Sequence, residues 1–447
     1  MIRKFSIYYI IFLFAFCWGL LVGYKKIFPY SIIKIVGKEV IQLFQDEKNM
    51  SDISVVDKIK NDLDIYPSKH LVPYNSTNLI NYKNLDINNF DLRRKFSPLF
   101  KNNFNEKDNT NIQDGYLLFQ GFFDFINAHH GALLINFNGE VLKSWEHDKL
   151  DFKDKKKSIN LQTHPVLILN DGSIIYTIHD DAYGLKILRV SYCGDLIWYK
   201  EEQFHHSFSL DKNNNIWTIK GKDEALVLID KDNGEILKEI LVSDIVSKNR
   251  NLGIFNLHLD LPGNDSLHLD PYHINDVEPL NKEIDGFAVD DLLISFRNSN
   301  LIFIMDQNLN IKWWKVGATI RQHDPDWGEN GITIFDNSMR NNSMDSEKKY
   351  MSRVININLE NNKIDELYNG SKHAAYTVIK GNHQILEENY LLATFSTQGR
   401  ILILNNDGEL KFELVNKYSK SFNGQIGETI WLSKNFFDFE VEKKVCE

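Results

Sequence analysis

The chain of 447 residues has little cysteine, little proline and no excess of positive charge. Three cysteines exclude a scaffold held mainly by disulfides and a cysteine-rich zinc module. Nine prolines and 24 glycines exclude a collagen-like or Pro/Gly-rich disordered chain. With 51 basic against 61 acidic residues, the net charge is -10. This charge argues against nucleic acid as a partner, because phosphate binding needs a basic surface.

An uncharged apolar segment lies near the N-terminus. Residues 5–24 carry no charge, and at ~1.5 Å per residue a helix of this length spans ~30 Å, the thickness of a bilayer core. We therefore predict an uncleaved transmembrane signal anchor over residues 1–28, with a cleaved signal peptide and a buried helix as alternatives. Basic residues flank both ends, so charge does not set the orientation.

A second N-terminal region, residues 29–110, is predicted to contain a juxtamembrane helix and an irregular spacer. Residues 31–45 place apolar side chains at helical spacing. Residues 46–110 are rich in Asn, Asp and Lys with scattered apolar residues. We expect this spacer to wrap partly on the main domain.

From about residue 111 onward, one unit repeats six times. Each unit is an apolar run, a short turn and a second apolar run, and turns such as Asn-Gly and Asp-Gly are hairpin signals. A four-stranded blade needs ~40–50 residues, so the longer intervals carry insertions, at about 241–270 and 338–352. The sequence predicts an all-β fold, a six-bladed β-propeller over residues 111–447, rather than a sandwich of hairpins. The turns lie at positions 139, 194, 234, 309, 362 and 408.

Four histidines occupy the same phase of this repeat. Each lies eight residues before a Gly or Asn that precedes or approaches the next apolar strand. The first strands of propeller blades line the central channel, so we expect the four side chains to converge there. Converging histidines are typical of metal binding, proton transfer or anion binding. The four are His164, His206, His273 and His323.

Several fragments, in this order along a six-fold repeat, resemble the bacterial arylsulfate sulfotransferases, the kind that use no nucleotide sulfate donor. The resemblance covers roughly residues 112–415. It implies a periplasmic six-bladed propeller that moves a sulfuryl group from one phenol to another through a sulfated histidine, with no cofactor. The fragments are FHHS at 204–207, DPYHIND at 270–276, LLISFRN at 292–298, RQHDP at 321–325, GITIFDN at 331–337, GNHQIL at 381–386 and GRI at 399–401.

The resemblance also implies roles for individual residues. His323 matches the histidine that becomes sulfated, and a neutral imidazole nitrogen is a good nucleophile near pH 7. Arg297 matches the arginine that clamps the sulfate, for which the fixed fork of guanidinium donors is suited. His273 and Asn275 match the family's His-x-Asn pair, with the Asn275 amide as a donor.

The remaining site residues are also histidines. His206 matches the other sulfate-contacting histidine, with His205 as the neighbouring alternative. A phenol with a pKa near ~10 needs a general base at neutral pH, and either His273 or His206 could supply it. The predicted catalytic set is His323, His273, His206 and Arg297, and the predicted substrate-binding set is Asn275, His205 and His164.

The cysteines depart from the family pattern. Better-known members carry a disulfide in the catalytic domain. Here Cys17 lies in the apolar N-terminal stretch, Cys193 in a hairpin turn and Cys446 next to the C-terminus. We therefore do not expect Cys193 and Cys446 to match that disulfide.

Two other functions remain open for the same residues. A membrane-anchored propeller could bind a sulfated or phenolic ligand, or a protein, without catalysis. Alternatively, the four phased histidines could hold zinc or copper, although the fixed positive charge of Arg297 suits an anion better than a metal. The partners that we predict are aryl sulfates, phenols and, through the N-terminal helix, a membrane, with the propeller periplasmic or otherwise extracytoplasmic. No resident metal is expected, and the oligomeric state is left open.

Overall fold

The computed structural model divides the chain into two units, Met1–Ile59 and Lys60–Glu447. Among the described residues, no helix is long and apolar enough to cross a membrane. The predicted membrane anchor lies outside the described residues except for positions 13 and 16–18, and the predicted juxtamembrane helix lies wholly outside them. The structure describes residues 13, 16–18, 70–73, 79, 81–87, 90, 92, 94, 96–108, 110–125, 128–147, 161–180, 183–255, 271–329, 331–338 and 351–446.

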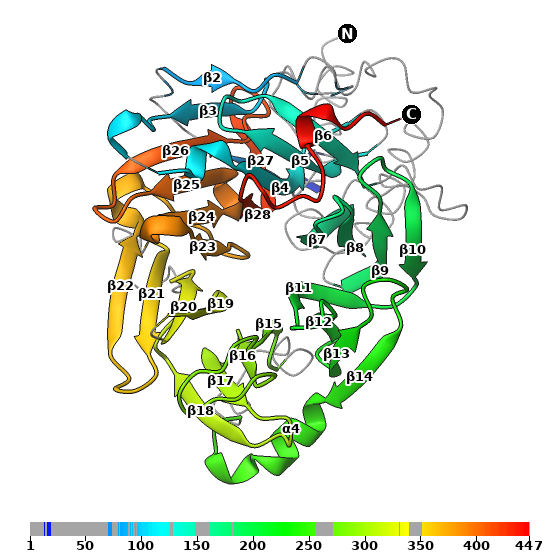
Figure 1. The fold of residues 1–447 in the computed structure, drawn as a ribbon, viewed down its shortest axis with the longest axis vertical. Coiled ribbons are helices and arrows are strands. Elements are labelled where there is room, and N and C mark those ends of the chain that lie inside the picture. The colour runs from blue at the N-terminus through cyan, green and yellow to red at the C-terminus, as the bar shows by residue number, and fades with distance from the viewer. Residues whose placement is uncertain are drawn as a thin grey trace, which may run out of the picture. The chain divides into compact units, whose positions relative to one another are not determined.

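The second unit contains six antiparallel sheets arranged in a ring, which confirms the predicted six-bladed all-β propeller (Figure 1). In every blade one strand faces the centre of the ring, and the others follow outward. Blade 1 is β28 (Ile426–Leu432), β4 (Tyr116–Phe122), β5 (His130–Asn136) and β6 (Val141–Glu146). Blade 2 is β7 (Leu161–Ile168), β8 (Ile174–Asp180), β9 (Tyr183–Val190) and β10 (Leu196–Lys200). Blade 3 is β11 (Phe204–Leu210), β12 (Ile216–Lys220), β13 (Ala225–Ile229) and β14 (Ile236–Leu241).

The other three blades follow in chain order around the ring. Blade 4 is β15 (Ile274–Pro279), β16 (Leu292–Phe296), β17 (Leu301–Met305) and β18 (Ile311–Val316). Blade 5 is β19 (His323–Gly328), β20 (Gly331–Asp336), β21 (Arg353–Asn358) and β22 (Ile364–Asn369). Blade 6 is β23 (His383–Ile385), β24 (Leu391–Phe395), β25 (Arg400–Leu404) and β26 (Leu410–Val415), and it is extended at its outer edge by β3 (Leu99–Asn102) and β2 (Lys83–Asn84).

The six hairpin turns read from the sequence are those between the third and fourth strands of the blades. The middle strands are buried on both faces, so β17 reads LIFIM and every residue is buried. The outer strands alternate, so in β18 the side chains of IKWWKV are exposed at every second position until the end of the strand. Continuous apolar runs for doubly covered strands and alternation for half-covered strands are the expected patterns.

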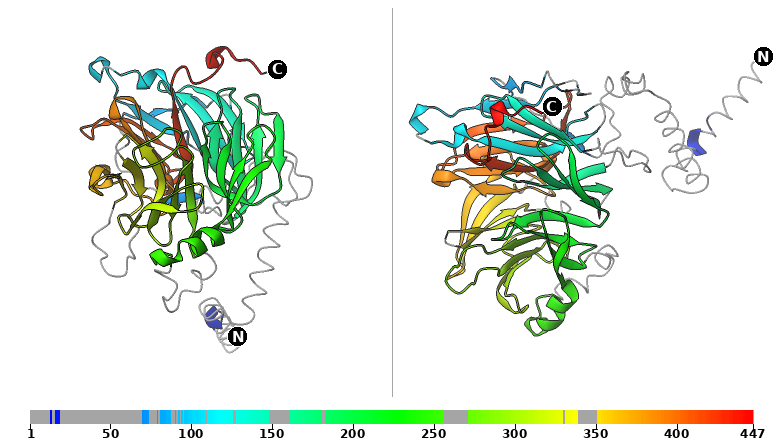
Figure 2. Two further views of the ribbon diagram at one scale, coloured as in Figure 1. Left: turned by 60° about the horizontal axis from the view of Figure 1, so that its bottom comes forward. Right: turned by 45° about the vertical axis from the view of Figure 1, so that its right-hand side comes forward.

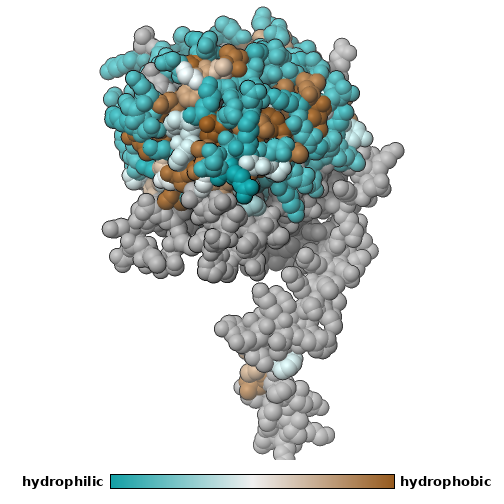
Figure 3. Space-filling view, turned by 90° about the horizontal axis from the view of Figure 1, so that it is seen from below, coloured by the Kyte–Doolittle hydropathy of each residue, from teal (hydrophilic) through white to brown (hydrophobic). Residues whose placement is uncertain are grey.

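Smaller elements complete the ring. The insertion after the third repeat contains α4 (Val242–Lys248) and η3 (Arg250–Leu252), at the outer edge near β14 and β18 (Figures 1 and 2). From the predicted spacer, β1 (Leu71–Pro73) pairs with β27 (Phe422–Gly424), and β3 pairs with β26. On the face drawn in Figure 3, the described residues are mostly hydrophilic, with apolar residues in small groups between them. The remaining 3-10 turns are η1 (Glu106–Asp108), η2 (Ile112–Asp114), η4 (Gly370–His373), η5 (Glu387–Asn389), η6 (Ser396–Gln398) and η7 (Val441–Lys443).

A disulfide joins Cys193 to Cys446, with the two Cα atoms 5.3 Å apart. From the sequence, Cys193 and Cys446 were not expected to match the disulfide of the family's catalytic domain. The structure corrects this expectation in one respect, because the two cysteines are bonded to each other. The physical reason lies in ring closure. The C-terminal strand β28 completes the blade built by β4, β5 and β6, and this brings the segment that follows it back to the β9–β10 turn, 253 residues earlier in the chain.

Candidate active site

The four phased histidines lie on the inner strands of four successive blades. His164 is in β7, His206 is in β11, His323 is the first residue of β19, and His273 directly precedes β15. The ring centroids of His164 and His206 are 6.2 Å apart, and those of His206 and His273 are 4.8 Å apart. We call these four residues the histidine cluster.

Each of the four inner strands departs from regular pairing at its histidine or directly after it. An extra residue in one strand of an antiparallel pair bends the strand and turns a side chain. His206 and His273 also have positive φ angles, 69° and 48°, which non-glycine residues rarely adopt and which are concentrated at functional sites. The register shifts fall between Thr163 and Val166, His205 and Ser209, Ile274 and Asp276, and His323 and Pro325.

The hydrogen bonds of His323 define which of its ring nitrogens carries the proton. Asn337 is fully buried, and its Nδ2 donates to the carbonyl oxygens of Thr377 (3.0 Å) and Lys380 (2.8 Å). Its Oδ1 therefore faces His323 Nδ1, at 2.6 Å. An amide oxygen only accepts, so Nδ1 is the protonated nitrogen. Nε2 is left with a lone pair, toward which the backbone N–H of Lys380 donates at 3.2 Å.

Arg297 is the charged group that acts most strongly on this imidazole. Burial, and next the positive charge of Arg297, hold the pKa of His323 well below its usual range. Arg297 is itself 7% exposed, lies directly after β16, and donates its backbone N–H to the His273 carbonyl oxygen at 3.1 Å. A neutral imidazole beside a buried guanidinium can present a nucleophilic nitrogen to an anion that the guanidinium attracts.

His206 and His205 have different surroundings. His206 lies between His164 and His273, and burial, followed by the charges of His205 and His273, lowers the pKa of His206 well below its usual range. His205 is 4% exposed, and its Nε2 lies 3.9 Å from Asp223 Oδ1, which also accepts the backbone N–H of Ile274. The ring geometry therefore favours His206 as the cluster member.

Asn275 links two blades. Its Nδ2 donates to the Gln322 carbonyl oxygen at 2.7 Å, so this donor connects β15 to the residue before β19. The Oδ1 of Asn275 is buried and, within the described part of the chain, has no hydrogen-bond partner. The Asn275 Nδ2, which we expected to donate to the substrate, thus already donates one hydrogen bond within the protein. The Asn275 atom that can still form a hydrogen bond with a ligand is the acceptor Oδ1.

Lys380 and Asn337 are site residues that the sequence reasoning did not assign. The Nζ of Lys380 donates to Gln162 Oε1 at 2.9 Å, and its charge contributes to lowering the pKa of His130 and His164, after burial. Lys380 lies in the loop before β23, so it does not occupy a position that recurs in the sequence repeat. Asn337 stands in the GITIFDN fragment, so its position in that fragment is a signal that could have found it.

A second group of ionisable side chains lies on the inner strands β15, β19 and β28, and we call it the carboxyl cluster. Burial raises the pKa of Asp276 and Asp326 well above the usual range, and it raises the pKa of Glu278 and Glu428 to about 8. Each of these four carboxyls is also influenced by the charge of Asp324. The cluster consists of Asp276 and Glu278 in β15, Asp324 and Asp326 in β19, and Glu428 in β28.

The hypothesis of a metal held by the four phased histidines is not favoured by their arrangement. Within the described part of the chain, the group whose ligand atoms lie within 4.8 Å of one another is Asp324, Asp326 and His383. It contains none of the histidine cluster. Buried neutral imidazoles with Arg297 beside them suit a bound anion, because a fixed cation repels a metal ion.

The protein is a six-bladed propeller with histidines on its inner strands and a buried arginine beside them, and a comparison of the sequence with protein families identifies its family. The model of the arylsulfotransferase (ASST) family matches residues 165–417, more than half of the chain. The chain therefore belongs to the arylsulfotransferase family, which supports sulfuryl transfer as its general chemistry and confirms the resemblance read from the sequence.

Solved structures resemble the chain only distantly. A protein of unknown function from Bacteroides caccae is 10% identical, with 71% of this chain and 99% of that chain covered and a TM-score of 0.45. A virginiamycin B lyase from Staphylococcus aureus is 15% identical, with 65% and 75% covered and a TM-score of 0.34. A streptogramin B lyase is 12% identical, with 74% and 97% covered and a TM-score of 0.40. No curated protein matches the chain.

Proposed function

We propose that the protein transfers a sulfuryl group from an aryl sulfate to a phenol, without a nucleotide sulfate donor, and that His323 is the covalent carrier. The observation that carries this proposal is the state of His323. Its Nδ1–H is directed at Asn337, its pKa is held low by burial and Arg297, and the nitrogen with a lone pair is therefore Nε2. A neutral, oriented imidazole is what a nucleophile needs.

In the first half-reaction, Nε2 of His323 attacks the sulfur of the aryl sulfate. The new S–N bond forms as the bond between sulfur and the aryl oxygen breaks, and the phenolate leaves and takes a proton from water. Arg297 stabilises the negative charge on the sulfuryl oxygens, as guanidinium groups do in phosphoryl transfer. The Lys380 N–H, which lies 3.2 Å from Nε2, then donates to a sulfuryl oxygen.

In the second half-reaction, the acceptor phenol gives its proton to His206 or His273 and attacks the same sulfur. The S–N bond breaks, its electron pair returns to Nε2, and the base later releases the proton to water. Burial keeps the pKa of His206 low, so His206 is neutral at pH 7 and able to accept a proton. His164, His205 and Asn275 would line the substrate site.

The test of this function is intact-mass analysis of the full chain after exposure to 4-nitrophenyl sulfate without an acceptor. We expect the chain to gain one sulfuryl group, located on His323 by peptide mapping, and to lose it when a phenol is added. His323→Ala should abolish the label and lower turnover by at least about a thousandfold. The matched control is His373→Ala, in η4 outside the inner strands. This variant should keep both the sulfuryl label on His323 and the turnover rate of the unaltered chain.

The same experiment decides between this enzyme and a non-catalytic propeller. The protein would be a non-catalytic binding protein if it bound the aryl sulfate saturably but showed no label on His323 and released no 4-nitrophenol. Unchanged turnover in His323→Ala would remove His323 as the carrier while leaving sulfuryl transfer itself intact.

We further propose that the protein is membrane-anchored through residues 1–28, with its propeller outside the cytoplasm. The Cys193–Cys446 disulfide supports this placement, because disulfides persist mainly in oxidising compartments. The uncharged run at residues 5–24 supports the anchor. In cell fractionation, the full chain should remain with membranes after a carbonate wash, and a chain that lacks residues 1–28 should not. Recovery of the full chain in the soluble fraction would exclude the anchor.

A further inference from the structure

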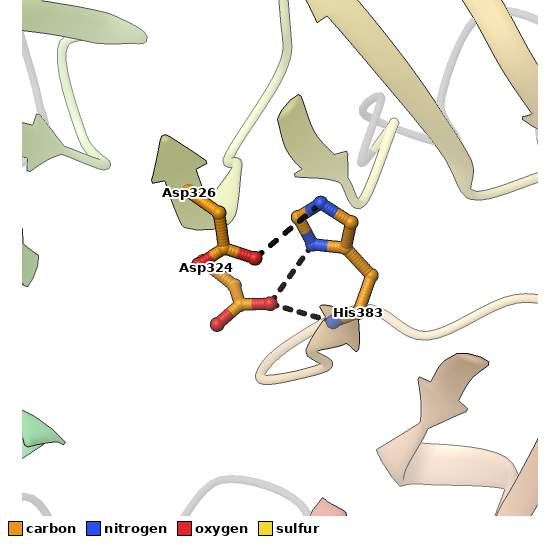
Figure 4. A group of neighbouring side chains, drawn as sticks. All are labelled: Asp324, Asp326 and His383. Carbon is orange, nitrogen blue, oxygen red and sulfur yellow. Dashed lines mark hydrogen bonds and ion pairs between the residues drawn. The ribbon is translucent and has the colours of Figure 1, made fainter. Parts of the chain in front are cut away.

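Asp324, Asp326 and His383 meet where the inner strands of blades 5 and 6 approach each other. Asp324 and Asp326 are in β19, and His383 is the first residue of β23. Asp324 Oδ2 accepts the backbone N–H of His383 and lies 2.9 Å from its Nδ1. Asp326 Oδ2 lies 3.6 Å from the other ring nitrogen, Nε2 (Figure 4).

These contacts determine the proton arrangement of the His383 ring. A carboxylate oxygen at hydrogen-bond distance accepts the Nδ1–H, so in the neutral ring Nε2 presents its lone pair. The His383 side chain is 0% exposed, and Nε2 has no hydrogen-bond partner among the residues that the structure describes. Figure 4 shows this nitrogen facing Asp326. A buried lone pair therefore points at a carboxylate oxygen across a gap that is too long for a hydrogen bond.

A metal ion fits this gap. Zinc binds imidazole nitrogen and carboxylate oxygen at about 2.0–2.2 Å, and two such ligand atoms 3.6 Å apart subtend roughly 120° at the metal. A ring nitrogen whose partner N–H is held by a carboxylate is also the usual arrangement of a metal-ligating histidine. Here Asp324 is that orienting carboxylate.

The charge around the group favours a cation as well. Asp276, Glu278 and Glu428 influence Asp326 electrostatically. Burial of several carboxyl groups in one place is costly unless protons or a cation compensate for their charge. The positive charge that acts on Glu428 is that of Lys380, and the same charge also acts on His164 of the histidine cluster.

We propose that His383 Nε2 and Asp326 bind a divalent cation of the zinc type between blades 5 and 6, with Asp324 orienting the imidazole and water or Asp324 completing the coordination. A ligand set of imidazole nitrogen and carboxylate oxygen suits Zn²⁺, Mn²⁺ or Co²⁺, whereas Ca²⁺ and Mg²⁺ prefer oxygen ligands alone. The ion is structural and takes no part in sulfuryl transfer. The inference does not rest on the proposed function, and it differs from the metal site first considered for the histidine cluster.

The experiment measures zinc directly. The purified full chain is stripped with a chelator, and Zn²⁺ alone is titrated into it by calorimetry, with unfolding temperatures recorded before and after addition. We expect one zinc ion per chain, a higher unfolding temperature with zinc, and no displacement by millimolar Ca²⁺. This measurement uses the unaltered chain, so it holds even where a variant fails to fold.

Three variants then locate the site. His383→Asn keeps an amide N–H near the place of Nδ1 and removes Nε2, and Asp326→Asn removes the anionic ligand; we expect each to weaken zinc binding by at least about 100-fold. Asp324→Asn, which acts through the imidazole, should weaken it by about 10- to 100-fold. His373→Asn, at a histidine outside the inner strands, should bind zinc as the unaltered chain does.

Two results would overturn the proposal. The first is an unaltered chain that takes up no zinc, in which case a second proton on His383 bridges the two aspartates instead. The second is a His383→Asn chain that binds zinc as tightly as the unaltered chain, since the zinc would then be bound elsewhere. Neither result depends on sulfuryl transfer, which is measured separately by the label on His323.

Discussion

The histidine cluster and the carboxyl cluster meet at the inner strands β15 and β19. Burial lowers the pKa of histidines in the first cluster and raises the pKa of carboxyls in the second. In β19, His323 is followed directly by Asp324. Burial lowers the pKa of His206 and His323, and it raises the pKa of Glu278 and Glu428 to about 8. Desolvation disfavours the charged form of either kind of group. The two clusters differ chemically in the groups that lie beside them. The Arg297 guanidinium acts on the imidazole of His323, whereas each carboxyl is surrounded by other carboxyl groups.

The largest effect that tests this comparison is expected at Arg297. Arg297→Lys keeps the positive charge and loses the planar fork of donors, so the sulfuryl oxygens are held less well as charge develops. We expect kcat/KM for 4-nitrophenyl sulfate to fall by about 10²–10³-fold. Arg250→Lys, at an exposed position in η3, is the control and should be unchanged. A rate for Arg297→Lys equal to that of the control would show that the histidine cluster works without the guanidinium.

A smaller loss is expected at Asn337, which orients His323 without touching the substrate. Asn337→Ala removes the shorter of the two hydrogen bonds of Nδ1–H and leaves the Arg321 carbonyl oxygen at 3.2 Å as its acceptor. The proton is then held less firmly on Nδ1 and can move to Nε2, which blocks the nucleophile. We expect kcat to fall by about 10- to 100-fold with KM nearly unchanged. Steady-state kinetics, with the unfolding temperature measured alongside, separates this positioning effect from a loss of structure. A rise in KM alone would contradict it.

A histidine outside the cluster tests whether burial alone produces the low pKa. Burial lowers the pKa of His147 to about 3, so this side chain stays neutral in the folded protein while it is protonated in the unfolded chain below pH 6.5. The stability that it contributes is present above 6.5 and is lost as the pH falls from 6.5 to about 3, at about 1.4 kcal/mol per unit. His147→Phe, beside the ring of Tyr176, should reduce this acid-dependent loss in urea unfolding. A pH dependence identical to that of the unaltered chain would contradict the shift.

The carboxyl cluster should show the opposite pH dependence. Glu428 has a folded-state pKa of about 8, above that of the unfolded chain, so the folded protein holds a proton that the unfolded chain loses. Stability therefore decreases as the pH rises from about 4.5 to 8. Glu428→Gln keeps an acceptor for the Val166 N–H, with which Glu428 Oε2 bonds at 2.9 Å. We expect it to gain about 4 kcal/mol at pH 8 and little at pH 4.5. Glu387→Gln, at an exposed position, is the control, and an equal gain there would remove Glu428 as the cause.

Much of the fold and part of the site could be predicted from local patterns. The hairpin turns at Gly139 and Gly234 mark blades because a two-residue turn needs positive φ. His206 and Arg297 were predicted because each stands in a fragment whose residue order is specific. Lys380 stands in no such fragment, and His383 stands in the fragment GNHQIL but was given no role. Their partners lie 57 to 218 residues away, and only the closed ring brings them together.

By itself, the sequence determined the number of blades, the strands that face the centre and the residues that converge there, because hydrophobic runs and turn residues act over short distances. The tertiary structure alone decided which ring nitrogen of His323 carries the proton and that Cys193 meets Cys446. It also decided that His383 faces Asp326. These outcomes depend on side chains brought together by packing within and between blades, and the disulfide depends on closure of the ring by β28, rather than on any spacing along the chain.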